Sequence, residues 1–470
     1  MVTPSSASPA RSSAGAGTAA GAALVPPLPA EHIGPLVGRL AWPVIAEQLL
    51  QTLVGVVDMA MVGRLGAAAV AGVGTSTQLL QLAISAMGAV SVGTTVLVAR
   101  ATGARQYRQA AHVTRQSLLA GALMGVVLGL AGWLLARPLI QLLGPEAEVV
   151  EQGAIYLAIS SAGSPALVLM LVAGGAFRGA GDTRTPLLAS AGMNLVNLVV
   201  AYVLVFGVLG FPALGIAGSA AGGVAGRLMG AALLLGMLAR GGGLADAPGR
   251  RWRIDLDVIW RVLRIGVPTA VEQTMLSAGF LLYGAMVIGL GTTVYATQRI
   301  TFQAINLAFM PAFGFATATT TLTGQSLGAA QPERVPLISR AALRQALFWM
   351  ILAGVLFAVL AEPVMRLFTA DTAVVELGRV ALPVLALAQP FWAVGQVYAG
   401  TLRGAGDARF PMLATSAGMW LVRLPLAYLF GIVLGWGLPG VYLSSTFDAA
   451  LRAVLNYYRY RSGRWRRTQV

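Results

Sequence analysis

RGAGD occupies residues 178–182, and the same five residues return at 403–407. The offset that takes Arg178 to Arg403, which we call the repeat offset, is kept along most of the chain. It relates Pro43 to Pro268, Glu47-Gln48 to Glu272-Gln273, Leu65-Gly66 to Leu290-Gly291, Arg115 to Arg340, Pro186 to Pro411 and Arg227 to Arg452. A single register shared by so many different residues predicts that the chain consists of two related halves.

The composition is typical of a membrane protein, because 57% of the 470 residues are hydrophobic, 10% are charged and the mean hydropathy is +0.76. Soluble proteins have about 25% charged residues, whereas a transmembrane helix needs roughly 20 mainly apolar residues. Twelve such runs occur, at 40–62, 70–99, 116–136, 153–176, 186–208, 212–237, 265–289, 294–322, 343–361, 378–401, 410–434 and 437–457. The sequence therefore predicts an all-α integral membrane protein with twelve transmembrane helices.

Each half contains six of these runs, so both halves enter the membrane from the same side. Two such lobes are expected to be pseudo-symmetric about an axis along the membrane normal, as in transporters that carry the substrate path between parallel repeats. We expect the N-terminal lobe at 35–239, a linker at 240–259 and the C-terminal lobe at 260–460. A twelve-helix bundle with a purely structural role is the alternative.

The charge is strongly asymmetric. The formal net charge is +15, and all 32 basic residues are arginines. Twenty-four arginines fall on one side of the predicted spans, and four, Arg64, Arg137, Arg366 and Arg379, fall on the other. The positive-inside rule then predicts a multi-pass protein of the plasma or inner membrane with both termini in the cytoplasm. A nucleic-acid partner is not expected, because the chain has no basic soluble domain.

The two ends of the chain differ from the spans. Residues 1–34 are mostly Ala, Ser, Gly and Pro, which is typical of a disordered cytoplasmic tail. A signal peptide is the alternative, but no dense apolar segment follows Arg11. Residues 461–470 form a second, basic tail.

The residue types present make several kinds of chemistry unexpected. The chain has no cysteine, so disulfides and cysteine metal sites are excluded. Its two histidines, His32 and His112, lie near predicted span ends, and we expect neither a metal site nor a resident cofactor. A membrane-embedded enzyme would need a cluster of catalytic side chains, which the sequence does not offer.

Several motifs, taken in order, resemble the multidrug and toxic compound extrusion (MATE) family. They are Ala41-Trp42-Pro43, Val57-Asp58-Met59, the segment Val62 to Gly66, the two RGAGD turns each followed by Pro, and Asn194 and Asn197 on the fifth predicted helix. The resemblance covers about residues 35–460. It implies alternating access between two lobes, with export of cationic or amphipathic compounds in exchange for H⁺ or Na⁺.

Four acidic residues fall inside predicted spans: Glu47, Asp58, Glu272 and Asp448. A charge at the centre of a bilayer costs about 2.5–3.5 kcal/mol or more, so such groups usually face a cavity or a partner. The resemblance aligns Asp58 with the family's acid for cation or proton coupling, and it places Asn194 and Asn197 near that role. The alternative for Asp58 is a structural hydrogen-bond acceptor.

Glu47 and Glu272 are related by the repeat. We expect them to face each other across the cleft and to bind a cationic substrate and protons alternately; pairing of each within its own lobe is the alternative. Some family members carry further acids where this chain has Ala201, Leu276 and Trp392. Because that leaves fewer carboxylates to hold sodium, proton coupling is favoured over sodium coupling.

The eighth span carries the other predicted substrate-cavity residues. Arg299, Gln303 and Asn306 share one helical face, since they are spaced i, i+4 and i+7. Arg299 is predicted either to neutralise Glu272 or to extend to the membrane surface. Gln48, Gln273 and Tyr283 complete the predicted cavity.

The remaining charged residues of the spans suggest structural roles. A salt bridge is expected between Asp448 and Arg452, which are four residues apart, and Arg227 and Arg423 are expected to be counter-ions inside their lobes. The RGAGD turns are predicted to be gating or structural elements in which Arg178 pairs with Asp182 and Arg403 pairs with Asp407. Their glycines would allow the tight turn.

The favoured function is therefore export of small organic cations by a protein whose partner is the lipid bilayer, and we expect a monomer. A flippase for an anionic or lipid-linked substrate is the alternative from the same wider superfamily. It would need several arginines in the central cavity, where the sequence offers Arg299.

Overall fold

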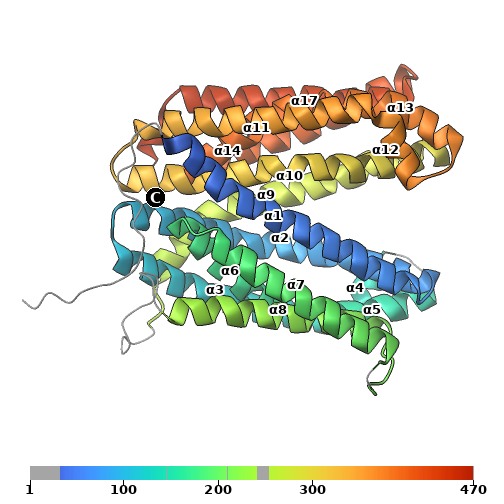
Figure 1. The fold of residues 1–470 in the computed structure, drawn as a ribbon, viewed down its shortest axis with the longest axis horizontal. Helices are drawn as coiled ribbons and strands as arrows, with labels where there is room; N and C mark the ends of the chain where they lie inside the picture. Colours follow the sequence, from blue (N-terminus) through green and yellow to red (C-terminus); the bar gives the residue numbers. More distant parts are fainter. Residues whose placement is uncertain (1–31, 144–145, 209, 241–252, 469–470) are drawn as a thin grey trace, which may run out of the picture.

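The computed structural model describes residues 32–143, 146–208, 210–240 and 253–468, and all regular secondary structure in these ranges is helical. Most of the predicted N-terminal tail, the middle of the predicted linker (241–252) and residues 469–470 lie outside the described residues. Figure 1 shows the helices running along the long axis of the molecule, in two groups that lie side by side.

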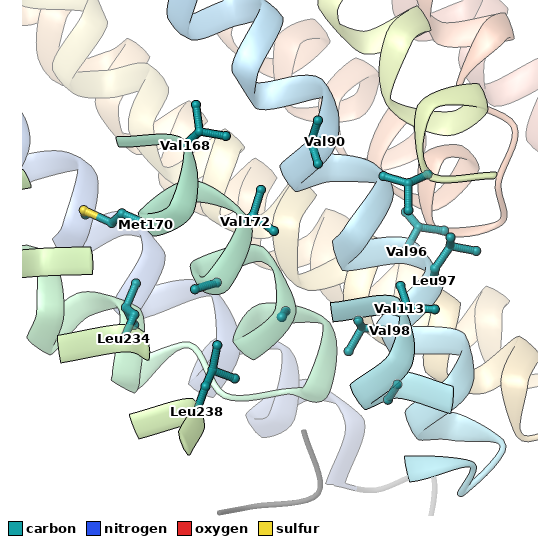
Figure 2. Close-up of a cluster of buried hydrophobic side chains, with 14 of the residues drawn as sticks. Val90, Val96, Leu97, Val98, Val113, Val168, Met170, Val172, Leu234 and Leu238 are labelled. Carbon is teal, nitrogen blue, oxygen red and sulfur yellow. The ribbon is translucent and has the colours of Figure 1, made fainter. Parts of the chain in front are cut away.

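The first group, the N-terminal lobe, consists of α1 (Ile33–Gly63), α2 (Ala67–Gly103), α3 (Tyr107–Leu134), α4 (Ala136–Gln141), α5 (Ala147–Ala162), α6 (Ser164–Ala180), α7 (Arg184–Phe206) and α8 (Ile216–Ala239). Its core lies where α2, α3, α6 and α8 meet. Val98, Val172 and Leu234, shown with their neighbours in Figure 2, are almost fully buried there.

The second group, the C-terminal lobe, consists of α9 (Leu256–Ile288), α10 (Thr292–Gly328), α11 (Arg334–Val359), α12 (Ala361–Phe368), α13 (Thr372–Ala386), α14 (Gln389–Gly404), α15 (Arg409–Ala417), η2 (Gly418–Arg423), α16 (Leu424–Tyr428), η3 (Leu429–Val433), α17 (Gly437–Arg461) and η4 (Arg464–Arg467). The segments η2 and η3 are π-helical turns within the eleventh span.

The twelve predicted spans are confirmed. Nine spans in the described part of the chain are long and apolar enough to cross a membrane without a sharp bend, and two bent pairs of helices add two more. The twelfth is α17, which the repeat relates to α8 and which is more polar because it carries Asp448 and Arg452.

Two spans are broken at equivalent places. α5 and α6 meet at an angle of 50°, and α13 and α14 meet at 40°. Pro165 and Pro390, which the repeat offset relates, stand in the first turn of the second helix of each pair. Proline has no backbone N–H to continue the preceding helix, so each span bends at this point.

The first helix of each lobe begins against the other lobe. Val37, Ala41 and Ile45 of α1 are buried in a cluster with α10, α11 and α14. Val258 and Val262 of α9 are buried in the core of the N-terminal lobe. Both contacts lie at the end of the molecule that carries the RGAGD turns, which we call the arginine-rich end; in Figure 1 the lobes spread apart toward the opposite end.

Candidate functional site

Asp58 lies within the N-terminal lobe and is held by a neutral side chain. Its Oδ2 accepts a hydrogen bond from Asn197 Nδ2 on α7, at 2.9 Å. Its Oδ1 is buried and has no hydrogen-bond partner among the described residues, and the same is true of Asn197 Oδ1 and Asn194 Nδ2. Three polar atoms of α1 and α7 are therefore buried there with unused hydrogen-bonding capacity.

Tyr156 of α5 and Arg227 of α8 border this polar cluster. Tyr156 interacts electrostatically with both Asp58 and Arg227. Arg227 directs Nη1 to the backbone carbonyl of Ser160 at 2.9 Å. Within the described residues Arg227 forms no ion pair with Asp58, so it is a nearby positive charge but not a direct counter-ion. Tyr156 was not predicted from the sequence, and no local motif signals it.

Glu272 is fixed by its own lobe. Arg403 Nη2 donates to both carboxylate oxygens, at 2.8 and 2.7 Å, and Thr415 Oγ1 donates to Oε1 at 2.8 Å. Glu272 is only 4% exposed, so this carboxylate is buried together with its counter-ion.

The repeat reproduces this arrangement around Glu47. Arg178 Nη1 donates to Oε2 at 3.3 Å and Ser190 Oγ donates to Oε1 at 2.8 Å. The expectation that the two glutamates face each other across a cleft is therefore wrong for this arrangement of the chain. A buried carboxylate requires a partner, and the arginine of its own lobe's RGAGD turn supplies it.

The aspartates of the turns do not pair with the turn arginines. Asp182 Oδ1 accepts from the backbone N–H groups of Arg184 and Thr185, both at 3.0 Å, at the start of α7. Asp407 accepts from Arg459 Nε of α17 at 2.7 Å. The predicted Arg178–Asp182 and Arg403–Asp407 pairs are thus wrong, because both arginines extend to the buried glutamates instead.

The glycines of the turns have the expected conformation. Gly181 has φ of 93° and Gly406 has φ of 86°. This left-handed region suits glycine and ends α6 and α14 in the manner of a helix C-cap. Each turn therefore exposes backbone carbonyls at the end of a helix.

Side chains of one lobe donate hydrogen bonds to the turn of the other lobe. Thr321 Oγ1 donates to Arg178 O at 3.1 Å, and Gln325 Nε2 donates to Gly179 O at 3.0 Å. Arg100 Nη2 donates to Ala405 O at 2.8 Å. We call these three hydrogen bonds the cross-lobe seal. It was not predicted from the sequence, although the repeat offset relates Arg100 to Gln325.

The predicted cavity residues of α10 do lie on one exposed face. Arg299, Gln303 and Asn306 are exposed, while the alternating Thr301 and Ala304 are buried. Gln273 of α9 is exposed and Gln48 of α1 is half-buried. The repeat adds Gln78 and Gln81 of α2, both exposed, as the equivalents of Gln303 and Asn306.

The structure disagrees with two predictions for the cavity, the one for Tyr283 and the pairing of Arg299 with Glu272. Tyr283 is 1% exposed and donates to Val441 O at 2.9 Å, so it is part of the core of the C-terminal lobe. Arg299 does not neutralise Glu272, whose carboxylate is taken by Arg403; its guanidinium lies 5.5 Å from the Tyr295 ring.

The C-terminal lobe contains a closed ionic cluster. Asp448 accepts from Arg452 Nε and Nη2 at 2.5 and 2.6 Å, and Arg423 Nη1 lies 3.8 Å from it. The Arg423 guanidinium also lies 4.7 Å from the Phe280 ring and 4.6 Å from the Tyr283 ring. The Asp448–Arg452 salt bridge and the role of Arg423 as a counter-ion are both confirmed.

The chain enters α9 through contacts with α3. Gln116 Nε2 donates to Arg253 O at 2.7 Å, and its Oε1 accepts from the Asp255 N–H at 3.0 Å. The His112 ring lies 2.9 Å from the Asp255 carboxylate, and this hydrogen bond, helped by the backbone N–H of Val258, lowers the pKa of Asp255. The start of the C-terminal lobe is thereby attached to the N-terminal lobe.

Comparisons with known proteins give a consistent result. The family model MatE matches this chain twice, over residues 43–203 and 268–429. A probable multidrug resistance protein NorM of Thermotoga maritima is 31% identical over 436 residues, covering 92% of this chain and 93% of that protein. An uncharacterized transporter YisQ of Bacillus subtilis is 29% identical over 433 residues, covering 91% and 94%.

Solved structures share the fold. A multidrug resistance MATE family transporter of the MOP superfamily, in an outward-facing conformation, is similar with a TM-score of 0.86 and 22% identity, covering 93% of this chain and 97% of that one. A MOP superfamily transporter from Pyrococcus furiosus gives a TM-score of 0.86 with 23% identity and the same coverage.

Proposed function

This chain belongs to the MatE family, and from that premise we propose that it is a secondary-active exporter of cationic or amphipathic organic compounds, exchanged for protons by alternating access. Relatives named as multidrug resistance proteins support the substrate class. We place the arginine-rich end in the cytoplasm, following the positive-inside rule. The protein acts as a monomer in the cell membrane, and the described arrangement, with its cross-lobe seal, is closed toward the cytoplasm.

The observation that carries this proposal is the difference among the four acids of the spans. Glu47 and Glu272 each have an arginine of their own lobe, and Asp448 has two arginines nearby. Of these four acids, Asp58 alone is held by an amide and retains a buried oxygen that has no partner within the described residues. Ionisable groups inside the membrane usually mark ion or proton paths, and a carboxylate without a fixed counter-ion can take up a cation without first releasing one. We therefore propose Asp58 as the coupling site, with Asn197 and Asn194 beside it.

The donor set favours a proton over sodium. Asp58 is the one carboxylate of this cluster within the described residues, and the neighbouring position that carries an acid in some relatives is Ala201, which is fully buried. A proton needs one acceptor oxygen, whereas hard metal cations take several oxygen ligands, often more than one carboxylate. Sodium is therefore the second choice for the coupling ion.

α1 provides a physical connection between the coupling site and the seal. It carries Asp58 near one end and Glu47 eleven residues earlier, roughly 16 Å away along the helix. Glu47 binds Arg178, whose carbonyl accepts from Thr321 of the other lobe. Neutralising Asp58 changes its hydrogen bond to α7, and any resulting movement of α1 is transmitted to the RGAGD turn.

The exposed amides of α2 and α10, together with Gln48 and Gln273, form the proposed substrate surface. In the described arrangement Glu47 and Glu272 are neutralised by arginines, so contact of either with a cationic substrate requires its pair to open in another state. Arg178, Arg403, Arg423 and Arg452 are engaged by carboxylates, which leaves few cations for the anionic substrate of a flippase.

The test is dye transport by everted membrane vesicles under an imposed pH gradient or an imposed sodium gradient. We expect transport driven by the pH gradient in the wild type, and its loss in Asp58→Asn, which has nearly the same shape but cannot take up the proton. Asp257→Asn is the matched control, because Asp257 is exposed and, among the described residues, its ion-pair partner is Arg261 on the same helix.

Each outcome has a distinct meaning. Retention of pH-driven transport in Asp58→Asn would contradict the assignment of the coupling site. Transport driven by the sodium gradient alone would contradict the proposal of a proton as the coupling ion, but it would leave the proposal of Asp58 as the coupling site in place. Absence of dye movement under both gradients would contradict the proposed substrate class and favour a flippase.

A further inference from the structure

A crevice opens between two transmembrane helices at the arginine-rich end of the C-terminal lobe. It has a volume of about 530 Å³. Its walls come from the start of α11, the end of α17 and the short η4 helix that follows it. Arg340, Arg461 and Arg466 line it, together with Tyr457, Tyr460 and Trp465.

The charge of the crevice is unbalanced. Three guanidinium groups line it, and none of its lining residues in the described part of the chain carries a carboxylate. Arg340, Arg461 and Arg466 are exposed, and in the part of the chain that the structure describes none of the three forms an ion pair. A nearby crevice between α9 and α17 differs, since its Arg459 is paired with Asp407 at 2.7 Å. Three unneutralised arginines in one concave site favour an anion with more than one acceptor oxygen.

The aromatic side chains give the crevice a fixed floor. Tyr398 of α14 lies 4.8 Å from the Tyr460 ring, which is stacked on the Trp465 ring at 6.0 Å. Trp465 is 2% exposed, and its Nε1 donates to Tyr460 O at 2.8 Å. The Arg466 guanidinium lies 5.3 Å from the Trp465 ring. The stack therefore holds η4 and its arginine against the lobe.

The position of the crevice favours a lipid. Tyr457, which lines the crevice, is 42% exposed, and exposed Tyr side chains are typical of the level of the lipid headgroups. Deeper along α17, next to the tyrosines of the crevice, Val454 is 62% exposed and offers an apolar surface to an acyl chain. Basic pockets between transmembrane helices bind anionic headgroups, each Lys or Arg contributing about 1 kcal/mol.

We propose that this crevice binds the phosphate headgroup of an anionic phospholipid from the leaflet at the arginine-rich end. A zwitterionic headgroup would bring a cationic amine toward three arginines, so an anionic lipid is preferred. Inorganic phosphate shares the same oxygen chemistry but gains nothing from the apolar surface beside the crevice.

Comparison of the two lobes indicates that the crevice is not a feature that both lobes share. At the equivalent positions of the N-terminal lobe Tyr398, Tyr457, Tyr460 and Arg461 are replaced by Ala173, Ala232, Leu235 and Gly236. The equivalent of Arg340 is Arg115, which instead lies 3.1 Å from the His112 ring. The aromatic floor and the arginines of α17 belong to the C-terminal lobe alone.

The experiment measures binding to the full-length protein, delipidated in a neutral detergent. Short-chain phosphatidylglycerol, short-chain phosphatidylcholine and inorganic phosphate are titrated separately, with native mass spectrometry and thermal unfolding as readouts. The variant is Arg340→Gln/Arg461→Gln/Arg466→Gln. The control is Arg39→Gln/Arg108→Gln/Arg184→Gln, which removes three exposed arginines of the same end from the other lobe.

We expect the wild type and the control to bind phosphatidylglycerol in preference to phosphatidylcholine, and the crevice variant to bind it on the order of 100-fold more weakly. If the triple variant does not fold, Arg466→Gln alone should weaken binding about fivefold. Equal binding by the crevice and control variants would overturn the proposal. Equal stabilisation of the wild type by inorganic phosphate would overturn the lipid assignment. None of these outcomes depends on transport.

Discussion

Closure of the arginine-rich end depends on glycines where α2 crosses α9. At Gly93 an added Cβ would overlap the backbone carbonyl oxygen of Val262, and it would lie 2.8 Å from the carbonyl carbon. An ordinary contact is 3.4–4 Å, so relief of the carbonyl-carbon contact alone requires α2 and α9 to separate by about 0.6 Å, and relief of the nearer oxygen contact requires more. Because the obstacle is backbone, no side chain can rotate to relieve it.

Overpacking of this kind costs about 1–3 kcal/mol. Since α2 and α9 belong to different lobes, that cost falls on the closed arrangement and is relieved when the lobes separate at this end. The ratio of the closed to the open arrangement should therefore fall by roughly 5- to 150-fold. Gly88→Ala is the matched control, because it lies on the same helix and its added Cβ would meet nothing within 4 Å.

The assay is a distance measurement between spin labels. The chain contains no cysteine, so labels can be attached at Gln109→Cys and Leu337→Cys alone, on exposed positions of α3 and α11. We expect the population with the longer separation to grow in Gly93→Ala and to stay at the wild-type level in Gly88→Ala. Superimposable distributions for the two alanine variants would refute the view that this crossing limits closure.

Two further predictions concern stability. Glu272→Gln should lower the free energy of unfolding by about 3 kcal/mol, because Arg403 then stays buried without its counter-ion. Glu47→Gln should lower it by less, since the distance between the charged atoms of its pair is 3.3 Å against 2.7 Å. Equal losses of stability in thermal unfolding would contradict this difference. The hydrogen bond to His112 is the main cause that lowers the pKa of Asp255 from 3.8. Because the folded pKa is the lower one, the ionised carboxylate stabilises the fold above its unfolded pKa. This stabilisation is lost as the pH falls through the folded pKa. The difference in Tm between wild type and Asp255→Asn should accordingly shrink as the pH falls below 3.8 and vanish once the pH is below the lowered folded pKa; a difference that does not shrink in acid would contradict the assignment.

The sequence predicted the number of spans because hydropathy reports what crosses a bilayer. It was less accurate on where helices begin: α3 starts at Tyr107, although the apolar run begins at 116. Its first turns carry Arg108, His112 and Arg115, which are polar but continue the same backbone hydrogen-bond ladder outside the hydrocarbon layer. The breaks at Pro165 and Pro390 were also missed, since each half of a broken span remains apolar.

The partners of the buried acids could not be derived from local spacing. Glu47 and Arg178 are 131 residues apart, and so are Glu272 and Arg403. Hydrophobic periodicity carries no information about a contact between distant helices. The repeat does carry such information. A glutamate and an arginine that occur at the same separation in both halves are candidates for an ion pair.

The two lobes share their buried Glu–Arg pairs but differ in the positions of their interior aspartates. The buried Glu–Arg pairs and the RGAGD turns are kept in both lobes, as expected for parts that must close against each other. Asp58, in contrast, is replaced at the equivalent position by Tyr283, while Asp448 corresponds to Gly223. Besides Glu272, which is common to the repeat, the second lobe thus has its interior aspartate on its last helix, where arginines neutralise it, whereas the first lobe has its interior aspartate on its first helix. An acid neutralised in this way cannot exchange a cation without exposing a buried guanidinium, and this asymmetry is our reason for proposing Asp58, and not Asp448, as the coupling acid.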